Sequence, residues 1–178
     1  MSSDTGFDVV DPIEGEDLSG VDGNQVIEPA SKVRFTLKDV KVNKVESKDD
    51  KEHLFTRLEP TFVVGPLGVD GNGKYKGKHF FGNRNLKFPG LLLARNKERY
   101  NTPWWKEKAA YGYKQFLTAL GLPTNPSPRV DDKFLQDLKG KEIIADIKRE
   151  AIEEKDENGK YYKTDEMENY LTNFRKVD

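Results

Sequence analysis

The sequence predicts a mainly β fold: a five-stranded barrel with one helix between its third and fourth strands, preceded by a flexible N-terminal arm. Segments in which apolar and polar residues alternate fall into two groups, three before Lys87 and two after Gly140. Apolar residues between the two groups recur with the period of an α-helix. Asn158-Gly159, a dipeptide typical of tight hairpin turns, separates the last two segments. This order of elements favours an antiparallel barrel.

The strands are expected at residues 31–42, 53–64, 74–86, 142–152 and 161–177. In the first strand Val33, Phe35 and Leu37 alternate with polar residues, and a change of phase before Val40 indicates a β-bulge. The second strand ends in the glycine-rich stretch 65–73, which is typical of turns. The first three strands would therefore form a meander.

The helix is expected between Asn96 and Leu122. Its apolar residues are spaced at i, i+4, i+7, i+8 and i+11, and they are Ala109, Tyr113, Phe116, Leu117 and Leu120. Gly121 and Pro123 end the helix. A short amphipathic segment, residues 131–138, then leads into the fourth strand.

The composition favours a small folded body without an active site. The chain has 178 residues, of which 35% are hydrophobic and 34% charged, so its core is modest. Cysteine is absent, which excludes disulfides, thiolate nucleophiles and zinc ribbons. The two histidines, His53 and His79, are too few for a His-rich metal centre or a convincing acid–base pair. We therefore expect no enzyme activity, no metal and no cofactor.

Charge is strongly segregated along the chain. Residues 1–31 contain eight acidic residues and no lysine or arginine, and they are expected to form an acidic flexible arm. Residues 32–115 contain 19 basic and nine acidic residues, and residues 116–178 contain 11 basic and 14 acidic residues. The folded domain is expected at 32–178. The chain begins without a signal peptide and has no apolar run of about 18 residues, so we expect a soluble protein without a membrane partner, located in the cytoplasm, or the host cytoplasm if viral.

The basic centre is also the aromatic part of the chain. Residues 74–114 hold eleven basic and two acidic residues, and residues 74–116 hold ten of the 19 aromatic residues. Single-stranded nucleic acids are bound by cationic grooves that follow the phosphates and by aromatic rings that stack on bases. The combination therefore predicts a single-strand-binding surface, and the acidic arm would compete with DNA for it or recruit a basic partner.

The first three strands and the segment that follows them are expected to contribute to this surface. Arg34, Lys38 and Arg57 lie opposite the apolar faces of the first two strands, and Phe80 is the ring expected among the bases. Residues 87–105 form a basic and aromatic insertion, expected as a mobile loop that closes over the strand, with at least one tryptophan in the core. The full set of candidate residues is Arg34, Lys38, Arg57, Lys76, Lys78, Phe80, Arg84, Lys87, Arg95, Lys97, Arg99, Tyr100, Trp104 and Trp105.

Several short segments of the sequence also resemble those of a known protein family. They are Val33-Arg34-Phe35-Thr36-Leu37 with Val40-Lys41-Val42, Leu58-Glu59-Pro60-Thr61-Phe62-Val63-Val64, Tyr75-Lys76-Gly77-Lys78-His79-Phe80-Phe81, Leu120-Gly121-Leu122 and Leu138-Lys139-Gly140-Lys141. This series, from about Val33 to Val177, resembles a family of phage-encoded single-stranded-DNA-binding proteins with oligonucleotide-binding (OB) folds. The resemblance implies a five-stranded OB-type barrel, sequence-independent binding of single-stranded DNA, a role in replication or recombination with the proteins of those processes as partners, and homo-oligomers as one possible state.

Two other functions are weighed against DNA binding. An alternative is an all-β structural or assembly protein of a virion that binds no nucleic acid, because an acidic arm that orders on assembly would suit it equally well. Quenching of Trp104 and Trp105 fluorescence by oligo-dT would favour DNA binding, whereas failure to bind single or double strands would favour the virion protein. A nuclease is disfavoured because residues 74–114 contain only Glu98 and Glu107 as carboxylates.

Overall fold

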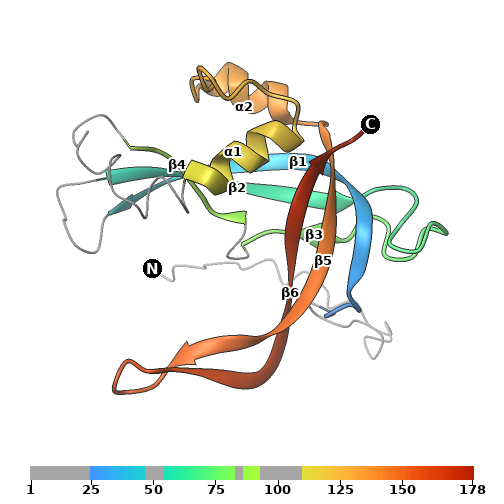
Figure 1. Ribbon diagram of the computed structural model, residues 1–178, viewed down its shortest axis with the longest axis vertical. Coiled ribbons are helices and arrows are strands. Elements are labelled where there is room, and N and C mark those ends of the chain that lie inside the picture. The colour runs from blue at the N-terminus through green and yellow to red at the C-terminus, as the bar shows by residue number, and fades with distance from the viewer. Residues whose placement is uncertain (1–24, 47–53, 83–85, 93–109) are drawn as a thin grey trace, which may run out of the picture.

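The protein is a mainly β barrel, as the sequence predicts. The computed structural model describes residues 25–46, 54–82, 86–92 and 110–178 (Figure 1). Its elements are β1 (Ala30–Glu46), β2 (Leu54–Val64), β3 (His79–Phe80), β4 (Phe88–Leu92), α1 (Ala110–Ala119), α2 (Asp132–Leu138), β5 (Glu142–Lys155) and β6 (Tyr161–Lys176). With β3 and β4 taken as two parts of one strand, five antiparallel strands form a nearly closed barrel of the OB type.

Strand β1 is the centre of the sheet, whose order is β3-β2-β1-β5-β6 with β4 also paired to β2. One part of β1 pairs with β2 and the other with β5, so this long strand belongs to both halves of the barrel. A register shift between Leu37 and Asp39 confirms the bulge expected before Val40. The bulge explains why buried side chains change from odd to even positions along β1: Phe35 and Leu37 are buried, and so is Val40.

Aromatic side chains close the barrel between β4 and β6. No backbone pairing joins these two strands among the described residues. The Phe174 ring lies instead 6.3 Å from Phe88 and 6.4 Å from Phe62, measured between ring centroids. Helix α1 adds Phe116, which is fully buried and stacks on Phe88 at 4.6 Å. The helix between the third and fourth strands therefore fills the barrel where the ladder is missing.

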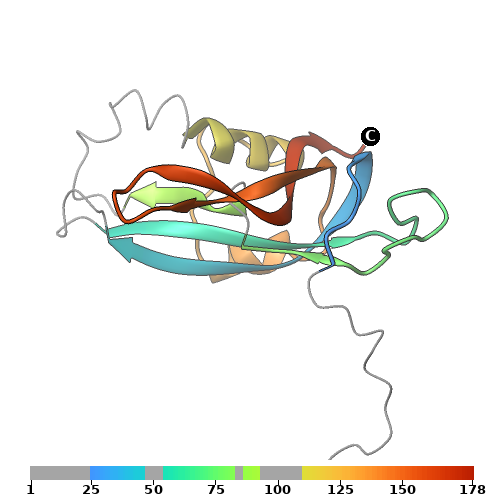
Figure 2. The same cartoon turned by 90° about the horizontal axis from the view of Figure 1, so that it is seen from below.

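The helical region contains two short helices where the sequence analysis expected one. Helix α1 covers the C-terminal part of the predicted helix, and residues 93–109 lie outside the described part of the chain. Helix α2 forms from the short amphipathic segment: the Asp131 side chain accepts a hydrogen bond from the Phe134 amide, and Phe134 and Leu138 are buried. Figure 2 shows α1 in yellow and α2 in orange as two distinct helices.

The third strand differs most from its prediction. Residues 74–78 form turns, β3 has only two residues, and β4 lies inside the predicted insertion 87–105. The cause is backbone conformation, because Tyr75, Gly77 and Gly82 have φ values of 59°, 80° and 73°. Residues with positive φ do not continue a β-ladder. Positive φ values on both sides of β3 therefore limit the predicted strand to two residues, and pairing with β2 resumes only at β4, beyond the predicted strand.

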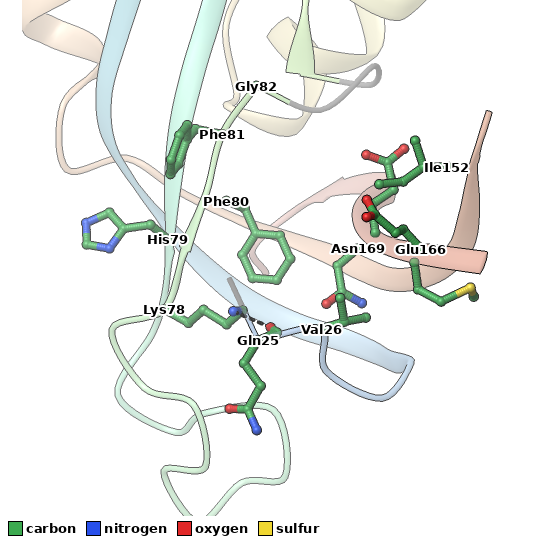
Figure 3. A pocket seen from close by; sticks show the side chains of 12 residues that line it. Gln25, Val26, Lys78, His79, Phe80, Phe81, Gly82, Ile152, Glu166 and Asn169 are labelled. Atoms are coloured by element: carbon green, nitrogen blue, oxygen red, sulfur yellow. Dashed lines mark hydrogen bonds between the residues drawn. The ribbon is translucent and has the colours of Figure 1, made fainter. Parts of the chain in front are cut away.

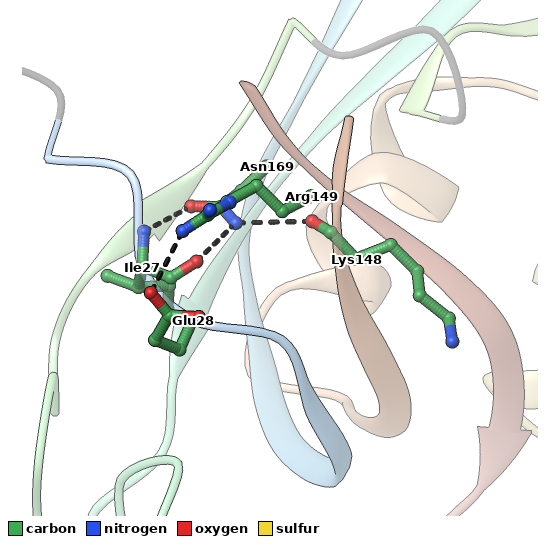
Figure 4. Close-up of polar contacts among 5 residues, drawn as sticks. All are labelled: Ile27, Glu28, Lys148, Arg149 and Asn169. Atoms are coloured by element: carbon green, nitrogen blue, oxygen red, sulfur yellow. Dashed lines mark hydrogen bonds and ion pairs between the residues drawn. The ribbon is translucent and has the colours of Figure 1, made fainter. Parts of the chain in front are cut away.

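The barrel begins earlier than the predicted boundary between residues 31 and 32. Ile27 is 1% exposed, and its backbone N–H and C=O are both bonded by the side-chain amide of Asn169, at 2.7 and 2.8 Å (Figure 4). The same amide donates to the Lys148 carbonyl at 3.1 Å, and Arg149 pairs with Glu28 at 2.9 Å. These bonds attach the chain before β1 to the hairpin formed by β5 and β6. Residues 1–24 of the predicted arm lie outside the described residues.

The β5–β6 hairpin confirms the prediction from Asn158-Gly159. Gly159 has a φ of 77°, and the Asp156 carboxylate accepts hydrogen bonds from the amides of Asn158 and Lys160. The hairpin extends well beyond the body of the barrel and curves at its far end (Figure 1). Register shifts at Ile144/Asp146 and Ala151/Glu153 supply the bulges that bend it.

Candidate functional site

The outer surface of β1, β2 and β3, called here the outer face, carries three of the seven described candidate residues, namely Arg34, Lys38 and Arg57. Strand pairing sets Thr36 beside Val63 and Val63 beside His79, which makes one row across the three strands. Because side chains alternate along a strand, the residues between the buried positions point to solvent. Arg34 and Lys38 are both exposed on this face, as the sequence predicts.

A hydrogen bond crosses the outer face from β1 to β3. The Lys38 Nζ lies 2.9 Å from the His79 Nε2, and the ammonium must be the donor because it has no lone pair. His79 therefore carries its ring proton on Nδ1 when this bond is made. The bond holds the Lys38 ammonium and the His79 imidazole over β2, the strand between β1 and β3. Lys41, further along β1, adds a second exposed ammonium group to this face.

Two arginines expected in the interface already have acidic partners. Arg57 Nε and Glu59 Oε1 lie 2.5 Å apart and both atoms are buried, so this pair is held tightly against β2. Arg34 is more open, with its Nη1 3.8 Å from Glu142 Oε2. The charge of Arg57 on the outer face is therefore neutralised by Glu59. Arg34 is only loosely paired with the exposed Glu142, so it can release this carboxylate and bind a phosphate instead.

The structure corrects the expectation that the Phe80 ring lies among bases. Phe80 faces inward: it pairs with Phe62 in the ladder, is 4% exposed, and its ring packs edge-on against Phe35 at 5.5 Å. Its neighbour Phe81 is 58% exposed and lies on the same side as His79 (Figure 3). The ring that shares a face with the cations is therefore Phe81.

The three remaining candidate lysines among the described residues, Lys76, Lys78 and Lys87, lie around the edge of this face. Lys78 donates from Nζ to the Gln25 carbonyl at 2.6 Å, so it is directed toward the chain that enters β1. Lys76 is exposed in the turn before β3, beside Lys74, whose ammonium lies 5.2 Å from the Tyr75 ring centroid. Lys87 is exposed between the buried Leu86 and Phe88.

Half of the candidate set falls outside the described residues. These residues are Arg84, Arg95, Lys97, Arg99, Tyr100, Trp104 and Trp105. Their contribution, and the expected core position of one tryptophan, stay predictions. The residues that the sequence analysis missed are Lys41, His79 and Phe81. The position of Phe81 could have been inferred by assigning Phe80 to the same inner side as Phe62.

A hollow of about 440 Å³ adjoins the outer face (Figure 3). It lies between residues 78–82, the chain at Gln25 and Val26, and the β5–β6 hairpin. Phe80, Val26, Ile152 and Met167 give it apolar walls, and Lys78, Glu166 and Glu168 add charge. The sequence analysis gave no hint of this hollow, because its walls come from three distant parts of the chain.

Within the described residues, no three His, Asp or Glu side chains come together as a metal site. None of the helices in the part of the chain that is described is long and apolar enough to cross a bilayer.

Neither the known family models nor the curated proteins contain a match to this sequence.

Proposed function

We propose that this protein binds single-stranded DNA without sequence preference, through the outer face of β1, β2 and β3. The observation that carries the proposal is the exposed Phe81 ring beside Lys38 and His79, on the face that OB-type barrels offer to oligonucleotides. A base can stack on the ring while the neighbouring ammonium of Lys38 attracts a phosphate.

The charge of the outer face supports an anionic ligand. Three acidic side chains on β1, β2 and β5, namely Asp39, Glu59 and Glu142, each lie in an ion pair, with Lys139, Arg57 and Arg34. These pairs offset the local negative charge. The exposed nitrogens of Lys38, Lys41 and Lys76 then give the face and its edge a positive excess.

Replacement of the exposed ring tests the proposal. Phe81→Ala should weaken binding of oligo-dT by roughly 5- to 150-fold, since one base–aromatic stack contributes about 1–3 kcal/mol. Tyr111→Ala is the matched control, because Tyr111 is 55% exposed but lies on α1, away from the outer face. Affinity is measured by fluorescence anisotropy of a labelled oligonucleotide.

Two results would overturn the proposal. If the unchanged protein binds neither single nor double strands in low salt, DNA binding is wrong and the virion protein becomes the better explanation. If Phe81→Ala and Tyr111→Ala bind equally well, the outer face is not the binding surface.

A further inference from the structure

The hollow beside the outer face contains groups of both charges, divided between its two sides. Lys78 lies on the β3 side beside the His79 ring, which accepts a hydrogen bond from Lys38, and Glu166 lies on the opposite side (Figure 3). Glu168 also lines the hollow and, like Glu166, belongs to β6. A nucleotide has the matching division, with a phosphate at one end and the hydrogen-bonding edge of a base at the other. The carboxylates then decide which bases can form hydrogen bonds in the hollow.

The walls of the hollow suit a flat apolar ring. Phe80, Val26, Ile152 and Met167 line it, and Phe81 lies on its rim with 58% of its surface exposed. A volume of about 440 Å³ exceeds what a single base needs, so part of the sugar and water can enter as well. The hollow is thus wide enough for one base turned away from the outer face.

The carboxylates set the hydrogen-bonding character of the hollow. Within the described part of the chain, neither the Glu166 nor the Glu168 side chain has an ion-pair or hydrogen-bond partner. An ionised carboxylate accepts hydrogen bonds and cannot donate them. It therefore favours a base edge that carries an amino group, such as that of cytosine, and disfavours the O4 carbonyl of thymine.

We propose that this hollow takes one base of a bound single strand and prefers a base with an exocyclic amino group. The inference rests on the proposed function, because the strand is brought to the hollow by the outer face. The preference concerns one base position and is added to binding that is otherwise independent of sequence. Glu166 and Glu168 are the positions that determine it.

The test compares two oligonucleotides, oligo-dC and oligo-dT of equal length, at neutral pH. The unchanged protein should bind oligo-dC about five- to tenfold more tightly, which is a modest value for hydrogen bonds to a charged group in a half-open site. In the double variant Glu166→Ala/Glu168→Ala the ratio of the two affinities should fall to about one.

A matched double variant separates recognition from net charge. Glu153→Ala/Glu157→Ala removes the same charge from exposed positions of the same hairpin, outside the lining of the hollow. Both double variants should bind DNA more tightly in low salt, because each loses two negative charges. Only the first should lose the preference for oligo-dC.

The outcomes distinguish this inference from the function on which it rests. Equal, strong binding of both oligonucleotides by the unchanged protein overturns the base preference and leaves the proposed function intact. A preference for oligo-dC that persists in Glu166→Ala/Glu168→Ala overturns the assignment to the hollow. Failure to bind either oligonucleotide overturns both.

Discussion

Asp146 joins three strands through a single buried carboxylate. It accepts hydrogen bonds from the Lys32 amide at 2.8 Å, the Asn173 side chain at 2.7 Å and the Arg175 guanidinium at 2.5 Å. Lys32 and Asn173 have positive φ values of 56° and 54°, which are costly for residues other than glycine. The carboxylate therefore stabilises two strained bulges at once.

Removal of the Asp146 carboxylate should be strongly destabilising. Asp146→Ala is expected to lower the free energy of unfolding by about 2–4 kcal/mol, since it leaves three donors without their acceptor. The measurement is urea unfolding followed by circular dichroism. Asp137→Ala, at an exposed position of α2, is the control and should change stability by less than about 0.5 kcal/mol.

The same carboxylate should contribute to sensitivity to acid. Burial of Asp146 acts to raise its pKa, but the hydrogen bonds from Asn173 and Lys32 and the charges of Arg175 and Lys148 outweigh burial, so the pKa lies below 3.8. The stabilisation is then fully present above the unfolded-state pKa and is lost as the pH falls through the lower folded-state value. An Asp146→Ala protein that loses stability between pH 5 and 2 as steeply as the unchanged protein would contradict this role.

Tyr113 is a second buried polar residue, with the opposite pH dependence. Its hydroxyl has no hydrogen-bond partner among the described residues, and burial raises the pKa of the phenol to about 12. The unfolded chain releases this proton near pH 10, so the folded state loses stability as the pH rises from 10 towards 12. Tyr113→Phe should remove that loss, about 2 kcal/mol, without lowering stability at neutral pH. Tyr111→Phe, on the exposed side of α1, should behave like the unchanged protein.

At the scale of elements, the loop between β2 and β3 depends on the backbone of Gly68. The residue has a φ of 66°, and a Cβ atom there would lie 2.3 Å from the Lys74 carbonyl oxygen. The loop turns back on itself at this point, since Val69 donates to Lys74 and Gly73 donates to Leu67. These hydrogen bonds hold the backbone at Lys74 close to Gly68, so there is no room for a side chain at residue 68.

Substitution of Gly68 should cost more than that of a neighbouring glycine. Gly71 also has a positive φ, of 81°, but a Cβ there would meet nothing within 4 Å. Gly71→Ala should lower the free energy of unfolding by about 1 kcal/mol, and Gly68→Ala by about 2 kcal/mol more, because strain and overlap add. Equal melting temperatures for the two variants would show that the loop can relax around the added methyl group.

Elements that could be predicted from the sequence are those set by local pattern. The alternation in β1, the periodicity of α1 and the turn at Asn158-Gly159 each act within a few residues, and each prediction is confirmed. The predicted extent of the third strand was wrong because the sequence around Phe80 does not reveal the left-handed backbone at Gly77 and Gly82. The hollow could not be predicted, because its lining depends on how the hairpin curves back toward Val26.

At the scale of the whole molecule, a near-zero net charge conceals the positive excess of the outer face. The formal net charge is -1, yet residues 32–115 hold 19 basic and nine acidic residues. If the outer face contacts about four to six phosphates, the logarithm of the affinity should fall with the logarithm of the salt concentration at a slope of about -3 to -4. Titrations at increasing salt measure the slope, and an affinity unaffected by salt would exclude phosphate binding.

The described chain begins at one edge of the outer face, directly after the acidic segment in sequence. Residues 1–24 contain seven acidic and no basic residues, and the described chain begins at Gln25, whose carbonyl accepts from Lys78. Deletion of residues 1–24 should raise the affinity for oligo-dT in low salt, because DNA and the segment would compete for the same cations. Equal affinity of the full-length and shortened proteins would exclude the competition.

The contact between Phe174 and Phe88 has a consequence for how the barrel can deform. A hydrogen-bonded ladder fixes the register of two strands, whereas ring contacts do not select one. Between β4 and β6 the described residues therefore have ring packing in place of a ladder, so a change in the size of these rings can alter the circumference of the barrel at this seam. A wider or narrower barrel would tilt the β5–β6 hairpin relative to the rest of the molecule, and would move Glu166 and Glu168 with it.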